Sequence, residues 1–415
     1  MHIIVIGAGV IGMTSAYYLA QKGHRITVVD ACAGPGQMTS MANGAQLSYS
    51  FVAPLAEPAV LGKLPGWLFD RQSPLSLHLR ADPQQWRWAM AFLAACSSRK
   101  SRQTTAELLT LGLYSRQMMH QLMTDDMLTF DFSRSGKLLV YQDAAAYDAA
   151  RKQMDYQATL GAQQQALDRQ QCVRLEPALR GIEQQIVGGI FTQSEDAGDC
   201  MKLCLELERV LRQRAGPVDF VYNTPVVRLH HERGQVTRLQ TQSGDMEADA
   251  YVIANGVGAQ MLGRQAGFNP HIYPLKGYSL TYELTAQSEA PHVSVSDVHN
   301  KVVYARVGNR LRIAGMVDIG DTSGVIRMGR IASLRQAAER YLPALHPAGE
   351  PVAWAGLRPA RPDSKPLIGR TPLRNLWMNA GQGALGFTLA AGSAALLANR
   401  LSGDSAPIAD RLFAP

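Results

Sequence analysis

The stretch of residues 3–30 constrains the fold of this chain more than any other part of the sequence. It opens with Ile-Ile-Val-Ile at residues 3–6, a short, continuously apolar and β-branched run that is typical of a strand buried on both faces of a parallel sheet. Three glycines in the pattern G-x-G-x-x-G come next: Gly7, Gly9 and Gly12. An apolar-rich segment, residues 10–19, then predicts a helix. The sequence therefore predicts a strand, a tight turn and a helix in direct succession.

Each glycine of this pattern has a separate physical role. Gly7 permits a sharp turn, Gly9 has no Cβ that would keep a pyrophosphate from the backbone, and Gly12 lets the helix lie close to its strand. The free N–H groups and the positive dipole end of the helix favour an anionic ligand. A second apolar strand, residues 26–29, ends at Asp30, whose carboxylate can accept ribose hydroxyls. An ordinary tight turn is the alternative, but all these features in register favour a dinucleotide site.

The composition limits the classes of partner. With 415 residues and 46% hydrophobic content, the chain is long enough for a large core and for two or more domains. The net charge of +7 and the pI near 9.2 favour attraction to acidic surfaces, including anionic lipid. The sequence has no long run of Lys and Arg and no basic motif, so we expect no nucleic-acid partner.

The cysteines and acidic residues give no sign of a metal site. The five cysteines are odd in number and contain no C-x-x-C pair, which fits a reducing compartment. Cys200 and Cys204 would share one face of a helix, where core packing explains them. The carboxylates of residues 194–199 match no calcium loop in their spacing, so we interpret Asp199 as the cap of a helix. We therefore expect no metal.

The sequence shows no recognisable targeting or membrane-spanning segment. No basic segment with an apolar run precedes the first strand, so we expect no signal peptide and a cytoplasmic protein. The longest apolar stretches, residues 86–96 and 384–398, are shorter than a helix that spans a bilayer. No transmembrane helix is expected.

A nucleotide-binding α/β domain is predicted from three separate segments, residues 1–50, 142–268 and 346–415. We expect residues 163–176 to be a surface connection and His230-His231 to be a surface turn. The further elements expected in this domain are helices at 201–214 and 384–401 and strands at 218–222, 226–229, 236–240, 246–248, 251–254 and 376–379.

The remaining segments, residues 51–141 and 269–345, predict a second domain. The first of them is rich in proline and carries a tryptophan and methionine cluster at residues 86–90, which indicates an insertion. The elements expected in it are helices at 106–123 and 331–341 and strands at 137–141, 273–282, 302–306 and 310–314, the last three forming a second sheet.

The whole chain resembles the D-amino-acid oxidase superfamily of FAD enzymes, most closely the bacterial D-amino-acid dehydrogenases. The motifs that carry this resemblance are GAGVIG, SMANGAQLS, APLAEPAVLGKLPGWLF, EDAGDC, NTPV, YPLKGYSL, WAGLRPARPDSKPLIGRT and NAGQGALGFTLAAGS. Two motifs depart from those dehydrogenases: they read N-A-G-Q where this chain has residues 43–46, and G-H-G-T-L-G-W where it has residues 381–387. The departures leave the subgroup and the preferred substrate open.

The resemblance implies an FAD cofactor, a Rossmann-like FAD-binding domain of the α/β class, and a discontinuous α+β substrate domain built on an antiparallel sheet. FAD is long, so residues far apart in the chain would contact it. The residues that we expect to do so are Ile6, Gly7, Gly9, Val10, Ile11, Gly12, Asp30, Ser40, Ala42, Asn43, Gln46, Val226, Ala254, Gly256, Gly381, Gly383, Ala384, Leu385, Gly386 and Thr388.

The expected reaction oxidises an amine by hydride transfer to flavin N5, with the substrate held by its carboxylate. Arg358, in the motif G-L-R-P, is the first candidate for that contact, since a guanidinium binds a carboxylate through two parallel hydrogen bonds. Tyr278 and Tyr49 are candidates to bind the carboxylate or line the pocket, with core packing as the alternative. Arg306 is either a second carboxylate contact or a solvated strand residue.

Three functions remain open from the sequence. The first is a dehydrogenase that converts D-amino acids to 2-oxo acids and ammonia and passes electrons to a quinone or membrane carrier. The second uses oxygen, as glycine and sarcosine oxidases do, or prefers D-proline or D-hydroxyproline, and the third is a flavin-binding subunit without turnover. The segment 54–77 is either a lid over the substrate or a peripheral contact with the inner face of the cytoplasmic membrane, because it mixes apolar and basic residues.

Overall fold

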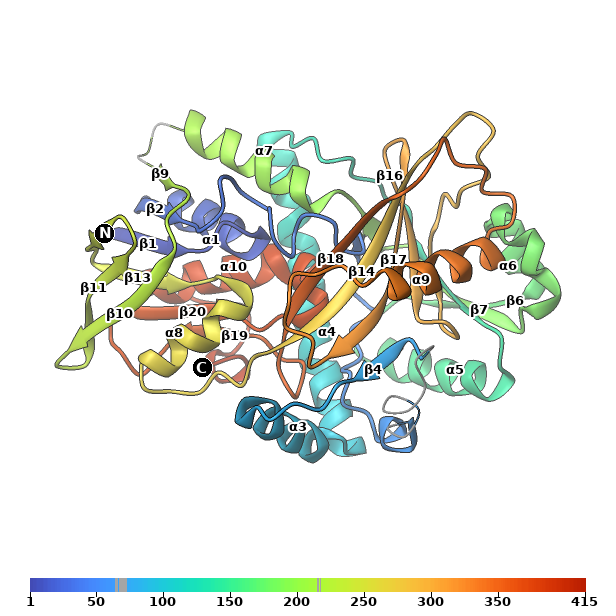
Figure 1. The fold of residues 1–415 in the computed structure, drawn as a ribbon, viewed down its shortest axis with the longest axis horizontal. Coiled ribbons are helices and arrows are strands. Elements are labelled where there is room, and N and C mark those ends of the chain that lie inside the picture. Colours follow the sequence, from blue (N-terminus) through green and yellow to red (C-terminus); the bar gives the residue numbers. More distant parts are fainter. Residues whose placement is uncertain (64–65, 67–72, 215, 217) are drawn as a thin grey trace.

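The chain folds around two large sheets that lie side by side (Figure 1). The structure is a computed structural model, and it describes all residues except 64, 65, 67–72, 215 and 217. In Figure 1 the six-stranded sheet with both chain termini lies on the left, and the larger sheet lies on the right.

The six-stranded sheet contains the first strand, turn and helix of the chain. Its strand order is β19-β20-β13-β1-β2-β9, and β1, β2, β9, β13 and β20 run parallel. The strands are β1 (His2–Ile6), β2 (Arg25–Val29), β9 (Val218–Val221), β13 (Ala250–Ile253), β19 (Leu367–Arg370) and β20 (Leu376–Ala380). The predicted Rossmann-like domain is confirmed, because β1 lies between β2 and β13 and is followed directly by α1 (Val10–Gln21).

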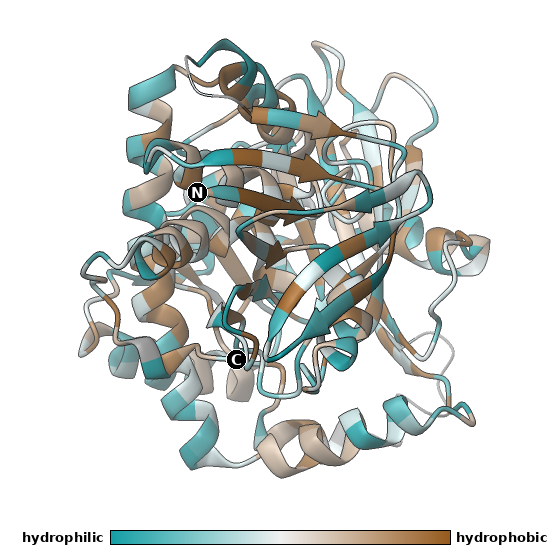
Figure 2. Cartoon of the chain, turned by 90° about the vertical axis from the view of Figure 1, so that its left-hand side faces the viewer, coloured by the Kyte–Doolittle hydropathy of each residue, from teal (hydrophilic) through white to brown (hydrophobic). Residues whose placement is uncertain are grey.

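Helices cover one face of this sheet, and a small meander covers the other. The first face carries α1, α4 (Ser98–Asp126), α7 (Cys200–Gln213) and α10 (Gly386–Ser402), which share one apolar core. Gly392 lets α10 approach α4 closely, since a Cβ there would lie 2.7 Å from the Cα of Ser115. The second face carries β10 (Val226–Glu232), β11 (Gln235–Thr241), β12 (Gly244–Met246) and α8 (Ala259–Gln265). Figure 2 shows apolar residues along the central strands and hydrophilic residues on the outer helices.

One helix passes the length and composition test for a membrane span within the described residues. It covers Gly383–Ser402, and 72% of its most apolar window is buried inside the protein. Since α10 packs between α1 and α4, its apolar residues belong to the core.

The larger sheet has the order β18-β14-β17-β16-β15-β5-β7-β6, with β4 beside β17. Its strands are β4 (Leu75–Leu77), β5 (Lys137–Tyr141), β6 (Gln165–Asp168), β7 (Gly188–Thr192), β14 (Tyr273–Glu283), β15 (Ser294–Asp297), β16 (Val302–Val307), β17 (Arg310–Ile319) and β18 (Val352–Ala360). Most neighbours are antiparallel, as predicted, but β15 pairs with β5 and β17 with β4 in parallel. Helix α9 (Met328–Tyr341) covers one face of it.

Strand pairing and helix packing differ from the predicted domain boundaries in three places. Strands β6 and β7, from the segment 142–268, pair in the larger sheet next to β5, and α5 (Ala144–Ala158) packs on them. Strand β18, from the segment 346–415, pairs with β14 in the same sheet. In the opposite direction, α4 comes from the segment 51–141 but packs in the core of the six-stranded sheet. The predicted boundaries assigned each continuous segment of the sequence to one domain. The sheets instead join strands of distant segments by backbone hydrogen bonds.

Several local expectations also differ from the structure. The expected surface connection at residues 163–176 contains β6 and the helix α6 (Arg169–Leu175), which has a capping box at Asp168. His230 and His231 lie within β10 and not in a turn. The predicted cap at Asp199 is confirmed, because its Oδ1 accepts hydrogen bonds from the N–H groups of Met201 and Lys202.

Candidate active site

The glycine turn lies at the carboxyl ends of β1 and β13. Gly7 has φ of +110°, and a Cβ on it would lie 2.7 Å from the carbonyl oxygen of Ala254. A Cβ on Gly12 would lie 1.7 Å from the carbonyl oxygen of Gly7, so the start of α1 depends on glycine there. Gly9 is different, since a Cβ on it would meet only the Oγ of Ser40, at 3.5 Å. Gly9 therefore faces free space at the helix start.

The start of α1 is suited to an anionic ligand. Gly9 is its N-cap and has no side chain to cap it, and the first turn of α1 contains no acidic residue. The N–H of Val10 donates to Ser40 Oγ at 3.0 Å, which places the predicted Ser40 beside the turn. Asp30, at the end of β2, accepts hydrogen bonds from the N–H groups of Ala8 and Cys32. Each of its oxygens retains a second lone pair for a ribose hydroxyl.

The second predicted cofactor segment, residues 381–388, leads into α10. This helix also lacks a side-chain cap and has no acidic residue in its first turn. Gly381 and Gly383 have positive φ angles, and a Cβ on Gly386 would meet no atom within 4 Å. The hydroxyl oxygen of Thr388 accepts a hydrogen bond from the N–H of Ser48. A second uncapped helix start thus stands near the loop that follows β2, as an extended anionic cofactor requires.

The loop of residues 39–48 connects this cofactor region to the larger sheet. The hydroxyl of Thr39 donates to the carbonyl of Leu357, and that of Ser279 donates to the carbonyl of Ala42. Further along, Arg312 donates to the carbonyl of Asn43, and the Gln46 amide donates to the carbonyls of Val295 and Tyr304. The amide of Gln46 therefore holds the loop on the sheet, a role that its prediction as a cofactor contact did not include.

These features fit FAD. Open glycine positions follow β1 and β13, at Gly9 and Gly256, and stand at the first residue of α10, Gly386, while a carboxylate that can accept ribose hydroxyls follows β2. The fitting residues come from the start, the middle and the end of the chain, as a long cofactor needs.

Arg358 lies on the face of β18 that is turned toward this cofactor loop. Arg358 is the cross-strand partner of Leu275 on β14, and cross-strand partners point to the same face of a sheet. Gly277 and Ser279, two and four residues after Leu275, point to that face as well. Ser279 bonds to the cofactor loop, so Arg358 shares the face that meets it. Loss of water around the guanidinium lowers the pKa of Arg358, and among the described residues Arg358 has no hydrogen-bond or ion-pair partner. A largely desolvated, unpaired guanidinium is suited to a carboxylate ligand.

Two predicted substrate contacts lie on the opposite face of the larger sheet. Tyr278 is buried beneath α9, and its hydroxyl donates to Asp318 at 2.7 Å. Arg306 donates to the carbonyl of Ala290 and alternates along β16 with Ala305 and Val307, which pack toward the cofactor loop. The structure favours the core-packing alternative for Tyr278, and it places Arg306 on the face of the sheet away from Arg358. Tyr278 is buried and Arg306 is half-buried, and each side chain bonds to another group of the fold.

The third candidate, Tyr49, has no exposed surface and packs in the core beside α4. Its carbonyl oxygen would lie 2.4 Å from a Cβ on Gly112 of α4. Burial, followed by the nearby charges of Asp196 and Glu195, raises the pKa of Tyr49 well above its ordinary value. The structure therefore gives Tyr49 a core position.

A buried pair of ionisable groups next to this segment was not anticipated. Lys137 Nζ donates to Ser48 Oγ at 2.7 Å and lies 4.7 Å from the centre of the Phe51 ring. Glu195 accepts from the N–H of Ser50, while its other oxygen has no hydrogen-bond partner among the described residues. Burial lowers the pKa of Lys137 to about 8 and raises that of Glu195 to about 7. The pair adjoins the end of the cofactor loop, so its ionisation affects the segment next to it.

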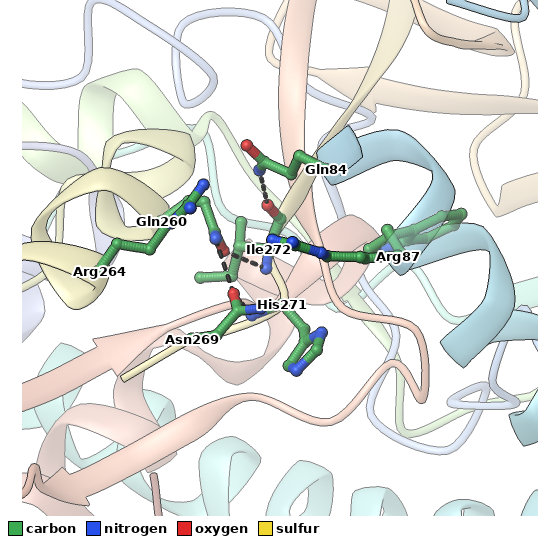
Figure 3. A pocket seen from close by; sticks show the side chains of 8 residues that line it. Gln84, Arg87, Gln260, Arg264, Asn269, His271 and Ile272 are labelled. Atoms are coloured by element: carbon green, nitrogen blue, oxygen red, sulfur yellow. Dashed lines mark hydrogen bonds between the residues drawn. The ribbon is translucent and has the colours of Figure 1, made fainter. Parts of the chain in front are cut away.

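Two pockets lie away from Arg358, and both are less suited to a substrate carboxylate than the surroundings of Arg358. The pocket in Figure 3 lies where the chain crosses between the sheets, and its polar groups bond to one another: Gln84 to the Ile272 carbonyl, and Gln260 to Asn269. A cavity of about 320 Å³ lies between α3 (Pro83–Ala95), α4 and residues 361–365. Its charged groups are paired, as in Lys365 with Glu107 and Arg361 with Asp363. Arg358 lines neither pocket and remains the better carboxylate anchor.

Comparison with known proteins shows the family of the chain and its cofactor. The family model described as DAO, FAD dependent oxidoreductase, matches residues 2–400. The chain belongs to the DAO family of FAD-dependent oxidoreductases. Its cofactor is therefore FAD.

Relatives and solved structures extend over the same length. The chain is 44% identical to D-amino acid dehydrogenase 2 of Ralstonia nicotianae over 423 residues, which cover 100% of this chain and 99% of the relative. It is 42% identical to D-amino acid dehydrogenase 2 of Pseudomonas aeruginosa, over 96% and 94% of the two chains. Glycine oxidase from Geobacillus kaustophilus has the same fold, with a TM-score of 0.78 at 20% identity over 99% and 97% of the chains.

Four residues near Arg358 and the cofactor loop were not predicted from the sequence. Trp354 and Gly356 stand on β18 beside Arg358, Gly277 pairs with Gly356 from β14, and Lys137 lies behind the cofactor loop. A signal for the glycines was present, since an isolated glycine within a strand pattern indicates close approach of another group. No comparable signal marks Lys137, whose burial depends on the pairing of β5 in the larger sheet.

Proposed function

We propose that this protein oxidises D-amino acids to 2-oxo acids and ammonia. The observation that carries the proposal is Arg358, an unpaired guanidinium on the strand face that meets the cofactor loop. The relatives named D-amino acid dehydrogenase, 35–44% identical across nearly the whole chain, support the substrate class.

Arg358 would hold the substrate carboxylate through two parallel hydrogen bonds and so fix the position of Cα. FAD, when bound, supplies the hydride acceptor. Since the Cα hydrogen would leave with both electrons, no side chain has to remove it as a proton, and the substrate nitrogen would give up its proton to water as the imino acid forms. The resulting imino acid reacts with water to give the 2-oxo acid and ammonia. The partial burial of Arg358 removes some of the water around the guanidinium and so strengthens its hold on the carboxylate.

A direct test is anaerobic reduction of the bound flavin by a panel of D-, L-, cyclic and N-methyl amino acids. The proposal requires that D-amino acids bleach the yellow colour fastest. Bleaching by glycine, sarcosine or D-proline alone would favour the second group of functions, in keeping with the glycine oxidase fold. A yellow protein that no amino acid bleaches would indicate a flavin-binding subunit without turnover.

We further propose that electrons pass to a quinone and that the protein contacts the cytoplasmic face of the membrane. Of the segment 54–77 that was expected to make this contact, Leu64, Trp67, Leu68, Phe69 and Arg71 lie outside the described residues. Val60 and Leu75 pack in a core cluster with Trp88 and Phe92 of α3. The outer face of α3 supports the proposal better, since Trp86, Met90 and Leu93 are all exposed there.

Vesicle binding tests this contact. We expect salt-sensitive sedimentation with anionic vesicles, weakened in the variant Trp86→Ser with Met90→Ser and in Trp67→Ser with Leu68→Ser. We also expect faster turnover with a soluble quinone than with oxygen. Rapid peroxide formation in air-saturated buffer, together with no vesicle binding at low salt, would contradict this proposal and support an oxidase.

A further inference from the structure

Two glycines on neighbouring strands lie directly opposite each other beside Arg358. Gly277 of β14 and Gly356 of β18 are cross-strand partners, so both hydrogen-only positions open on the same face of the sheet. This is the face that meets the cofactor loop through Ser279. A patch of bare backbone therefore interrupts the side chains of the sheet next to the proposed substrate anchor.

Two large planar side chains cover this patch from opposite ends. A Cβ on Gly277 would lie 2.5 Å from Nη2 and 2.8 Å from Cζ of Arg358, so the guanidinium lies over Gly277. A Cβ on Gly356 would lie 2.1 Å from Cη2 and 2.3 Å from Cζ2 of Trp354, so the indole ring lies over Gly356. Cross-strand Cβ positions are about 5 Å apart, which makes the guanidinium and the indole neighbours.

Trp354 is not held by the cores that surround it. Ala353 and Ala355, its chain neighbours, pack beneath α9 on the opposite face. The indole itself is only partly buried and belongs to none of the apolar clusters of the described residues, and its N–H has no hydrogen-bond partner among them. A tryptophan that lies on bare backbone beside a carboxylate anchor has the position of a pocket wall.

We propose that Gly277 and Gly356 are positioning residues for Arg358 and Trp354, and that Trp354 is the wall that selects substrates by the size of an apolar side chain. The inference rests on the proposed function, since it places the side chain of the amino acid whose carboxylate Arg358 holds. With the carboxylate on the guanidinium, groups attached to Cα extend over the neighbouring indole. The class of substrate is a D-amino acid with a small apolar side chain.

Binding of benzoate, a carboxylate that is not oxidised, tests the positioning role through the absorption spectrum of the bound flavin. We expect Gly277→Ala to weaken benzoate binding at least tenfold and to raise KM for the amino acid much more than it lowers kcat, with flavin content unchanged. Gly349→Ala, where a Cβ would meet nothing within 4 Å, is the matched control and should behave as the wild type.

A double-mutant cycle separates positioning from a general structural effect. In an Arg358→Ala background, Gly277→Ala should have no further effect on benzoate binding, because its clash partner is gone. If Gly277→Ala alone fails to fold, Arg358→Ala should restore folding by removing the overlap. An additive loss, or no rescue of folding, would overturn the positioning role. Likewise, in a Trp354→Ala background, Gly356→Ala should have no further effect.

The specificity role predicts that Trp354→Ala raises the ratio of kcat/KM for D-phenylalanine over D-alanine at least tenfold, while Trp354→Phe has an intermediate effect. An unchanged ratio would refute the role of Trp354 in selecting substrates by side-chain size. The outcomes also separate the two proposals. If D-amino acids do not reduce the wild-type flavin but the benzoate cycle is non-additive, the proposed function fails and the positioning role stands. If D-amino acids reduce the wild-type flavin and the benzoate cycle is additive, the proposed function stands and the positioning role fails.

Discussion

The carboxylate of Asp30 accepts a hydrogen bond of 2.6 Å from the backbone N–H of Ala8, the residue between the first two glycines of the turn. The acid at the end of β2 therefore supports the conformation of the glycine loop, and it is also the residue that we propose as the ribose acceptor. These two roles belong to one side chain, so a single substitution affects both.

Replacement of Asp30 is therefore expected to weaken FAD retention more than loss of a ribose contact alone. Asp30→Ala removes the acceptor for the N–H groups of Ala8 and Cys32 as well as the ribose contact. We expect a purified protein with reduced flavin content and a lower Tm for the apoprotein. Asp219→Ala, which removes an exposed carboxylate of β9, is the control. Full flavin content in Asp30→Ala would contradict the ribose role.

Gly9 and Gly12 are expected to respond differently to the same added methyl group. A Cβ on Gly9 has only ordinary contact with Ser40, so Gly9→Ala should leave the fold intact but reduce FAD binding, and Gly9→Val should abolish it. Gly12→Ala, which overlaps the carbonyl of Gly7, should impair folding itself. Flavin absorbance and thermal unfolding of the apoproteins measure the two effects. A fully yellow Gly9→Val protein would mean that the cofactor lies elsewhere.

Arg358→Lys keeps the charge but loses the planar fork that binds a carboxylate. We expect a loss in kcat/KM on the order of 2 to 4 kcal/mol in transition-state terms, with little loss of flavin, and a larger loss for Arg358→Ala. Arg306→Lys is the matched control on the opposite face of the sheet. Steady-state kinetics with D-alanine decide the question, and equal losses in both lysine variants would refute the assignment.

Tyr278→Phe tests the position of this tyrosine in the core beneath α9. It removes the hydroxyl that donates to Asp318, which also pairs with Arg330 at 2.7 Å. We expect a loss of stability of about 1 to 3 kcal/mol, since a buried acceptor loses one donor, and a nearly unchanged KM. Chemical denaturation and kinetics give the two quantities. A raised KM with unchanged stability would return Tyr278 to the substrate site.

The buried pair of Glu195 and Lys137 is expected to make stability depend on pH. Burial raises the pKa of Glu195 from 4.5 to about 7, so the stability that its neutral form contributes is fully present below pH 4.5 and is lost as the pH rises to 7. Lys137, whose pKa falls from 10.5 to about 8, acts in the opposite direction: its contribution is full above pH 10.5 and is lost as the pH falls through 8.

Glu195→Gln isolates the acidic half of this dependence. Between pH 5 and pH 7.5 the wild type should lose stability relative to the variant by on the order of 1 to 3 kcal/mol. Urea unfolding at several pH values measures the difference, with Glu232→Gln, an exposed position on β10, as the control. A constant difference across this range would show that Glu195 does not titrate there.

The sequence was sufficient for the elements whose local pattern determines their structure. Gly7, Gly9 and Gly12 together with the apolar runs on either side predicted β1, α1 and β2 within two residues of their observed ends. The cap at Asp199 was predicted for the same reason, because a side chain that bonds the next turn is a local feature.

The sequence was not sufficient for the faces and partners of the strands in the larger sheet. Strand β14 is buried on both faces, so its residues show no alternation that would separate Tyr278 from Gly277 and Ser279. A β-bulge between Gly277 and Tyr278 further changes the register with β17. The pairing of β18 with β14 joins segments about 80 residues apart and leaves no mark in either strand.

The position of β1 between distant partners has a consequence for biosynthesis. Its neighbour β13 spans residues 250–253, and the helix packed on α1 spans residues 386–402. At typical elongation rates the first helix waits on the order of 20 to 70 seconds for that partner to leave the ribosome. During this time the part of α1 that packs on α10 remains uncovered, and the nascent chain cannot complete the proposed binding region for its cofactor. A cell that makes this enzyme must therefore protect the growing chain until α10 has been made.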